Sequence, residues 1–188
     1  MNRPMRQRAR QVTDRAILRT MLDQMDILFL GIRDEPAPYV VPLNFGYDFD
    51  DDLVFYFHCT KAGAKLDLLR ADPHVCVTAA QFISYAGGSV MGHLHDYRSI
   101  IARGIASQID PETEGEAFHH ALCRLLIQQK RDVSQADTPL TGHIQMWKIV
   151  CKPEDVTAKA EIKPSSPEEV AFRAPVPDGI PLDESHIL

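Results

Sequence analysis

The stretch FHCTKAGAKLDLL, residues 57–69, joins a segment that alternates like a β-strand to one with helical spacing. The junction carries His58, Thr60, Lys61 and Lys65. A helix start has unpaired backbone N–H groups and about half a unit of positive charge. Thr60 is a candidate cap, and two lysines four residues apart share one helix face. The junction is therefore a candidate phosphate site, although its spacing alone favours an ordinary capped surface helix with two solvated lysines.

Other chemically capable residues give weaker patterns. The two histidines of HLHD, residues 93–96, share a face only on a strand and have no third ligand in register, so a metal site is a minor alternative. His119 and His120 are neighbours in a predicted helix, where one exposed and one half-buried side chain is the expectation. The four cysteines form no C-x-x-C pair, which favours reduced thiols in a cytoplasm and argues against a zinc site.

Length and composition predict one folded domain. The chain has 188 residues, of which 45% are hydrophobic, and a formal net charge of −6. A nucleic-acid surface needs surplus Lys and Arg, so this charge argues against one. No apolar run approaches the roughly 18 residues that suggest a membrane span, and the basic start MNRPMRQRAR has no apolar segment after it. We expect a cytoplasmic protein without nucleic-acid or membrane partners.

Hydrophobic periodicity predicts short strands that follow one another, with helices attached. Helical spacing covers residues 12–24, 60–70 and 110–130, with Asp14 or Thr13, Thr60 and Asp110 as the candidate caps. The strand candidates are residues 26–32, 39–47, 53–58, 74–82, 97–109, 144–152 and 155–160. This order predicts a mainly β protein, an antiparallel barrel with attached helices, in preference to a doubly wound parallel sheet.

The composition changes after residue 160. EIKPSSPEEVAFRAPVPDGIPLDESHIL is rich in proline and acidic residues and has no sustained period. We expect residues 1–160 to form the barrel domain and residues 161–188 to form an extended, partly ordered tail. Within the last long strand, Met146 and Trp147 are expected to serve as core and as dimer contacts.

Three segments together resemble a known family. They are YVVPLNFGYD, then LVFYFHCTKAGAKLDLLRADPHVCV, then YRSIIARGIASQIDPETEGEAFHHALCRL. In order and spacing they are similar to the pyridoxamine 5′-phosphate oxidase-like flavin-binding split-barrel proteins, and most similar to the family associated with 5-nitroimidazole antibiotic resistance. The resemblance implies a six-stranded antiparallel split barrel that forms a homodimer and binds FMN in grooves between the subunits.

The resemblance also assigns residues to the flavin. Lys65 would hold the phosphate, with Thr60 and Lys61 beside it, and Ser99 would lie near the phosphate end. His58 would lie near the ring or the substrate as the catalytic candidate, although a structural strand-end histidine is an equal alternative. The strand that would offer backbone groups to the ring comprises Pro42, Leu43, Asn44 and Phe45.

The function that follows is an FMN-dependent reductase of nitroaromatic or related small electrophiles, with a nicotinamide as the electron source. The alternative is a flavin or haem carrier or sensor on the same barrel, without turnover, because a fold does not determine a function. A deazaflavin or FAD in place of FMN is a further alternative.

Overall fold

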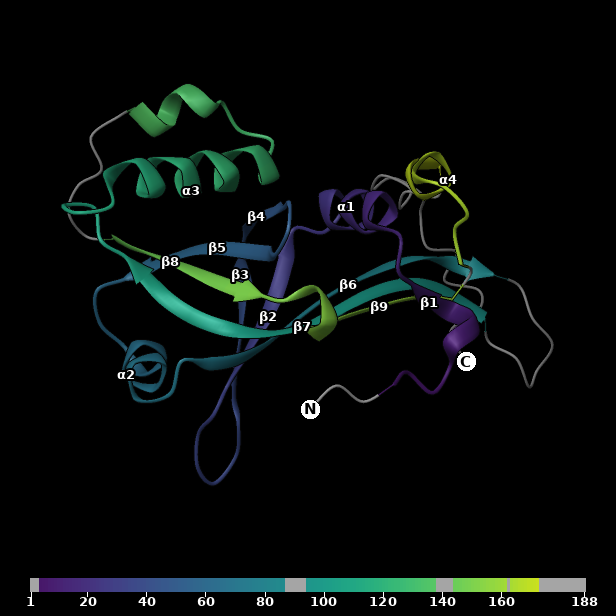
Figure 1. Ribbon diagram of the computed structural model, residues 1–188, viewed down its shortest axis with the longest axis horizontal. Helices are drawn as coiled ribbons and strands as arrows, with labels where there is room; N and C mark the ends of the chain where they lie inside the picture. Colours follow the sequence, from purple (N-terminus) through teal and green to yellow (C-terminus); the bar gives the residue numbers. More distant parts are fainter. Residues whose placement is uncertain (1–3, 87–93, 138–143, 162, 173–188) are drawn as a thin grey trace, which may run out of the picture.

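The computed structural model describes residues 4–86, 94–137, 144–161 and 163–172 (Figure 1). Within these ranges the chain forms one antiparallel sheet of nine strands with helices packed around it. The strands are β1 Gln11–Val12, β2 Ile27–Ile32, β3 Tyr39–Asn44, β4 Gly46–Phe49, β5 Leu53–Thr60, β6 His74–Ala86, β7 Leu94–Ile109, β8 Ile144–Cys151 and β9 Val156–Ala160. The helices are α1 Arg15–Asp23, α2 Ala64–Ala71, α3 Gly115–Gln128 and α4 Pro167–Phe172, with the short 3₁₀ turns η1 Arg8–Arg10, η2 Val133–Asp137 and η3 Pro153–Asp155.

The strand order explains how the sheet closes. Its path runs β3-β2-β6-β7-β8-β5-β4, with β9 paired to β7 and β1 paired to β9. The two ends of this path, β3 and β4, are consecutive in the chain and are joined by Phe45 alone. The sheet therefore curls into a half-open barrel, which confirms the predicted mainly β split barrel. If β3 and β4 are taken as one bent strand, six strands form the barrel and β1 and β9 are attached to it.

Alternation along the strands separates an inside from an outside. In β2, Leu28 and Leu30 are fully buried in the barrel, whereas Ile27 and Phe29 are each 46% exposed on its outer surface. A strand places successive side chains on opposite faces, so this pattern follows from the backbone alone. β8 differs because α3 covers its outer side. Met146 and Trp147 are therefore both buried, which confirms them as core residues. Their contact with a second subunit stays a prediction.

The helix starts differ from the predicted caps in two of three cases. Asp14 caps α1 as predicted, since its Oδ1 accepts a hydrogen bond of 3.0 Å from the Ile17 N–H. Asp110 does not cap α3. It accepts from the Glu112 N–H at 2.9 Å in a preceding turn, and α3 begins five residues later. Local side-chain hydrogen bonds compete with helix formation, and here the turn is favoured.

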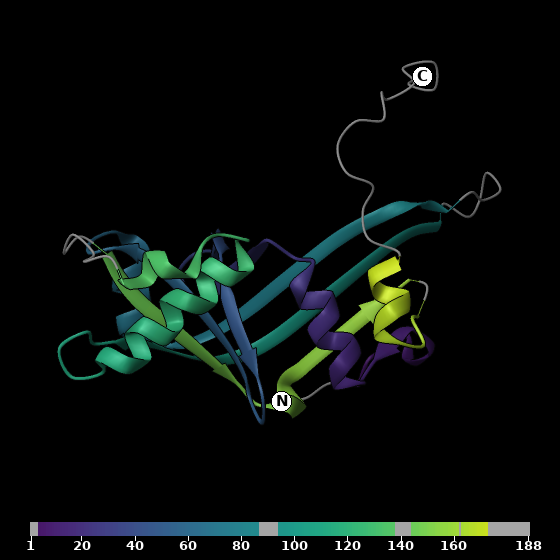
Figure 2. The ribbon, with the colours of Figure 1, turned by 90° about the horizontal axis from the view of Figure 1, so that it is seen from above.

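The segment after residue 160 begins with an ordered helix. α4 lies beside α1, at the opposite end of the sheet from α3 (Figure 2). Its Val170 is fully buried in the main core, and the carbonyl of Val170 accepts 3.0 Å from the buried guanidinium of Arg98. Arg98 also donates to Gln24 at 2.8 Å. The domain boundary at residue 160 stays a prediction, but residues 167–172 pack against the barrel domain.

Candidate functional site

The corner between β5 and α2 is built differently from the sequence expectation. α2 begins at Ala64, and its cap position is Gly63, whose φ of 132° lies in a region that favours glycine. Thr60 donates instead to the Ala62 carbonyl at 3.1 Å. The prediction that Thr60 caps the helix is therefore wrong. No side-chain cap was found for this helix start in the described part of the chain.

The two lysines of the corner also differ from each other. Lys65 belongs to the first turn of α2, is half-buried, and places its ammonium 5.6 Å from the centre of the Phe57 ring. Lys61 is exposed and precedes the helix, so the two do not share a helix face as predicted. A helix start without a side-chain cap next to a half-buried lysine suits an anion such as a phosphate.

His58 lies close to this corner on the outer surface of the barrel. It is exposed near the end of β5, opposite Met146 of β8. Partial burial and the nearby Lys65 charge lower the pKa of His58 below 6.5. The imidazole is consequently neutral at neutral pH, when it can donate or accept a hydrogen bond.

Three of the four predicted flavin residues belong to β3 and Phe45 follows it, and their side chains lie on two sides of the sheet. Pro42 and Asn44 point outward and are exposed, whereas Leu43 packs against the core and Phe45 is fully buried edge-to-face on Phe55. Only the backbone of Phe45 is therefore available to a ligand. Among the strands of the described ranges β3 pairs with β2 alone, so within these ranges it is an edge strand with unpaired backbone groups along one side. This edge fits the predicted backbone role.

Ser99 does not join the corner within one chain. Ile109 of β7 pairs with Met146 of β8, and Met146 pairs in turn with His58 of β5. Ser99 lies ten residues before Ile109 along β7. That separation is about 30 Å of strand. Ser99 instead shares a row with Ala80 of β6, near the end of the sheet where Ile27 of β2 pairs with Asn44 of β3.

This row belongs to a large apolar surface that we call the outer face, formed by β3, β2, β6 and β7 where α3 does not cover the barrel. Its exposed side chains include Ile27, Phe29, Val40, Ile101 and Ile105. A depression of about 650 Å³ continues it, with Gly31, Cys76 and Arg103 among its lining residues. The sequence analysis missed this surface. The run ILFL in β2, apolar on both faces, is the signal that could have revealed it.

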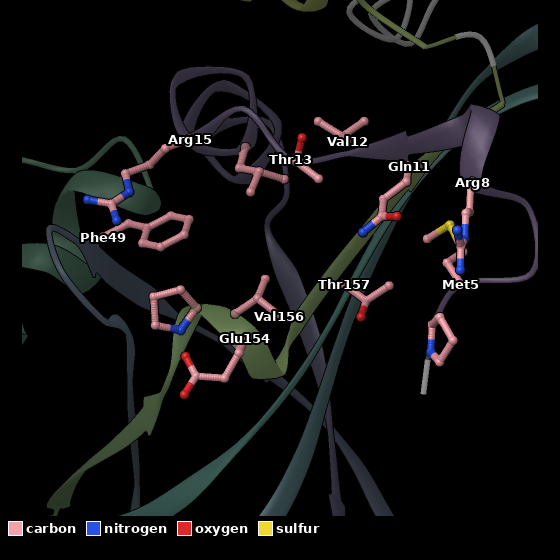
Figure 3. Close-up of a pocket in the computed structure, with 13 residues that line it drawn as sticks. Met5, Arg8, Gln11, Val12, Thr13, Arg15, Phe49, Glu154, Val156 and Thr157 are labelled. Atoms are coloured by element: carbon pink, nitrogen blue, oxygen red, sulfur yellow. The ribbon is translucent and has the colours of Figure 1, made fainter. Parts of the chain in front are cut away.

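A second cavity, of about 630 Å³, lies between the N-terminal segment, α1 and β9 (Figure 3). Gln11, Thr13 and Thr157 line it, and Arg15 stands over the Phe49 ring at 5.2 Å. None of the predicted site residues lines this cavity.

Within the described residues no group of three or more His, Cys, Asp or Glu side chains is placed to hold a metal ion. His93 and the side chains of His95 and Asp96 lie outside the described part of the chain, so HLHD stays a prediction. No helix in the described ranges is long and apolar enough to cross a membrane.

The fold and the corner define the class of a split-barrel protein in which α2 begins without a side-chain cap at the β5–α2 junction. Residues 14–160 match the family model described as pyridoxamine 5′-phosphate oxidase, and the chain belongs to that family. A search of curated proteins gave no match.

Solved structures show the same fold. A candidate 5-nitroimidazole antibiotic resistance protein from Bacteroides thetaiotaomicron is 27% identical, with a TM-score of 0.60 over 80% of this chain and 86% of that one. The flavocytochrome Anf3 from Azotobacter vinelandii is 17% identical, with a TM-score of 0.65 over 96% and 90%. The FAD and haem binding protein from Mycobacterium smegmatis is 16% identical, with a TM-score of 0.63 over 95% and 93%.

Proposed function

We propose that the chain is a flavin-dependent oxidoreductase that binds FMN and reduces nitroaromatic or related small electrophiles. The observation that carries the proposal is the start of α2, which has no side-chain cap and holds half-buried Lys65 in its first turn. The similar proteins support a flavin, because one is a flavocytochrome and another is an FAD and haem binding protein. The 27% identical protein, a candidate for 5-nitroimidazole resistance, supports the nitroaromatic substrate.

Each part of the site has a role in this proposal. Lys65 and the first N–H groups of α2 bind the phosphate, and Lys61 adds positive charge nearby. The unpaired edge of β3 offers backbone groups to the polar edge of the ring system. A bound flavin supplies the hydride chemistry, with a nicotinamide as the electron source. His58 lies near the substrate side and, being neutral, donates a hydrogen bond to it.

A homodimer completes the proposal. The outer face carries Pro42, Asn44 and Ser99, which project from the barrel as His58 does. Ser99 can approach a flavin phosphate at the corner only if it comes from a second copy, because within one chain it lies too far along β7. A two-fold contact between outer faces would cover the exposed apolar side chains and bring the two sets of residues together.

An absorbance spectrum of the purified protein, followed by acid release and chromatography of the bound group, tests the cofactor. We expect flavin bands and release of FMN. Release of FAD or of a deazaflavin would retain the site and change the cofactor. A colourless protein that binds no added FMN would contradict the proposal.

The second candidate function is a flavin or haem carrier or sensor without turnover. Two similar structures that cover 96% and 95% of this chain favour it, since one is a flavocytochrome and the other is an FAD and haem binding protein. A Soret band in place of flavin absorbance would identify a haem protein.

Single-turnover reoxidation of the reduced protein by a nitroaromatic separates enzyme from carrier. We expect reoxidation by wild type and a rate about 10²-fold lower in His58→Gln with unchanged flavin content, as for loss of a proton-donating group. Equal rates in both proteins would remove His58 from the reaction. No reoxidation in either would favour the carrier.

A further inference from the structure

A cysteine, a histidine and an aspartate lie in one line on the side of the molecule that carries α3 and η2. His119 and Cys123 are four residues apart on α3, so they lie one turn from each other. The Cys123 sulfur is 3.7 Å from His119 Nδ1. The other ring nitrogen, Nε2, is 2.9 Å from Asp137 Oδ1 of η2. The helical spacing predicted one exposed and one half-buried histidine at 119 and 120, and both side chains are about half exposed.

This order of groups is that of an activated nucleophile. An aspartate that accepts from Nε2 holds the histidine in the tautomer whose Nδ1 is free to accept a proton. A free Nδ1 next to a thiol can take the thiol proton, and the resulting imidazolium stabilises the thiolate beside it. The thiolate is the reactive form of cysteine. The contact between Cys123 and His119 and the contact between His119 and Asp137 therefore both favour reactivity at Cys123.

We propose that Cys123 is a reactive thiol that His119 activates and Asp137 orients, and that it exchanges with low-molecular-weight disulfides. The Cys123 thiolate attacks one sulfur of the disulfide, and the S–S bond of the small molecule breaks as the new Sγ–S bond forms. The leaving thiolate takes the proton that His119 holds. Cys123 is oxidised, one half of the small disulfide is reduced, and an added thiol reverses the reaction.

The other three cysteines lie in different surroundings. Cys59 and Cys151 are buried, and burial raises the pKa of both thiols, that of Cys151 to about 12. Cys76 is partly exposed on the outer face. Cys123 is partly exposed as well, but it has a histidine within hydrogen-bonding distance. The proposal therefore predicts modification at one position of four.

The charged groups around the cluster favour uncharged disulfides. Asp137 of η2 places a negative charge next to His119. The nearby His120 and Arg124 of α3 both contact the Asp48 carboxylate of β4. On the side of β8, Lys148 pairs with Glu114. Because Asp137 and the net charge of −6 repel anions, neutral hydroxyethyl disulfide is a suitable probe.

Alkylation of the full-length protein with iodoacetamide at pH 7, followed by peptide mass spectrometry, gives a rate for each cysteine. We expect Cys123 to react fastest in wild type and about tenfold more slowly in His119→Gln, since an ordinary thiol is only a few per cent ionised at this pH. Asp137→Asn is expected to slow it about threefold. His120→Gln, on the same helix, is the matched control and leaves the rate unchanged. Labelling of buried Cys59 and Cys151 reports any variant that unfolds.

Hydroxyethyl disulfide gives the second measurement. We expect one mixed disulfide per chain, at Cys123, formed more slowly in His119→Gln and absent in Cys123→Ser. Equal rates of alkylation in wild type and in folded His119→Gln would overturn the proposal. An absent adduct at Cys123, or adducts that form equally fast in both proteins, would overturn it too. Neither measurement depends on a bound flavin.

Discussion

At the scale of single residues, Lys65 and Lys61 carry the same charge in different positions. Lys65 is half-buried in the first turn of α2, so an anion at the helix start meets its ammonium and the backbone N–H groups together. Lys61 is exposed and lies outside the helix, where solvent screens its charge. Comparing substitutions of the two lysines therefore tests whether the start of α2 holds a phosphate.

Replacing Lys65 with Ala is expected to weaken FMN binding about 10- to 100-fold, because a charge-assisted contact contributes about 1.5–3 kcal/mol. Titration of the apo-protein with FMN measures this. Lys61→Ala is the matched control, and we expect a smaller change from it. Both variants should melt at the wild-type temperature. Equal losses from the two variants, or none from either, would contradict the assignment.

The lowered pKa of His58 gives a prediction of how the free energy of unfolding depends on pH. Its folded pKa is lowered from 6.5 by partial burial and by Lys65, so the unfolded chain binds a proton at higher pH than the folded one. The free energy of unfolding therefore falls as pH drops through 6.5 toward the folded pKa. His58→Gln removes this contribution and should flatten the fall.

Urea unfolding of wild type and His58→Gln at a series of pH values between about 8 and 5 measures the difference. We expect the two proteins to differ by a constant amount above the usual histidine pKa. Below it, wild type should lose stability faster than the variant. Parallel curves over the whole range would show that His58 is not perturbed in the folded state.

At the scale of elements, the sequence predicted the strands because most of them have one buried face. Leu53, Phe55 and Phe57 point into the barrel from β5 as their alternation indicates. β8 shows the same alternation in its buried residues Trp147, Ile149 and Cys151. The sequence did not indicate that the outward-facing Met146 is buried as well, because α3 covers it and comes from a different part of the chain.

The structure brings predicted site residues together only where they are close in sequence. His58 and Lys65 lie seven residues apart, and the Lys65 charge is near enough to lower the pKa of His58. The separation of Ser99 from them depends on the register of β7 against β8, which no local pattern encodes. The cap position of α2 is Gly63 and not Thr60 as predicted, because the Thr60 hydroxyl donates to the Ala62 carbonyl in the preceding turn.

The contact between β4 and α3 gives an element-scale prediction. A Cβ on Gly46 would lie 2.4 Å from the backbone carbon of Arg124, so α3 must move away in Gly46→Ala. Overpacking of this kind costs about 1–3 kcal/mol. Gly115→Ala is the matched control, because a Cβ there meets nothing within 4 Å and alanine favours helix. Thermal melting should show a loss in the first variant only; equal melting temperatures would show that α3 adjusts without cost.

α4 gives a second prediction at this scale. A chain that ends at residue 161 lacks Val170, which is fully buried and whose carbonyl accepts from Arg98. Loss of one buried side chain and one acceptor is expected to cost about 3 kcal/mol, or roughly 6–12 °C in melting temperature. A chain that ends at residue 172 is the reference. Similar melting of the two truncated chains would mean that α4 is only a surface attachment.

At the scale of the whole molecule, one part of the barrel's outer surface is covered by a helix and another part carries exposed apolar side chains. α3 covers the part formed by β4, β5 and β8 and buries Met146 beneath it. The outer face has no such cover in the described chain, although it carries Ile27 and Phe29 at 46% exposure and Val40 at 58%. Apolar side chains gathered in this way are typical of a protein interface. The same face carries Pro42, Asn44 and Ser99, so the proposed dimer and the proposed flavin site depend on each other.

Phe29→Lys is therefore expected to produce a monomer, because it places an unpaired charge in the proposed apolar contact between two outer faces. Light scattering at several concentrations measures the mass, and FMN titration of the same samples should show weaker binding in the variant. Ile127→Lys is the matched control. Ile127 is 48% exposed on α3, outside the outer face, so this variant should remain dimeric with unchanged affinity. A wild-type monomer that holds one flavin per chain would instead place the whole site within a single barrel, with Ser99 outside it.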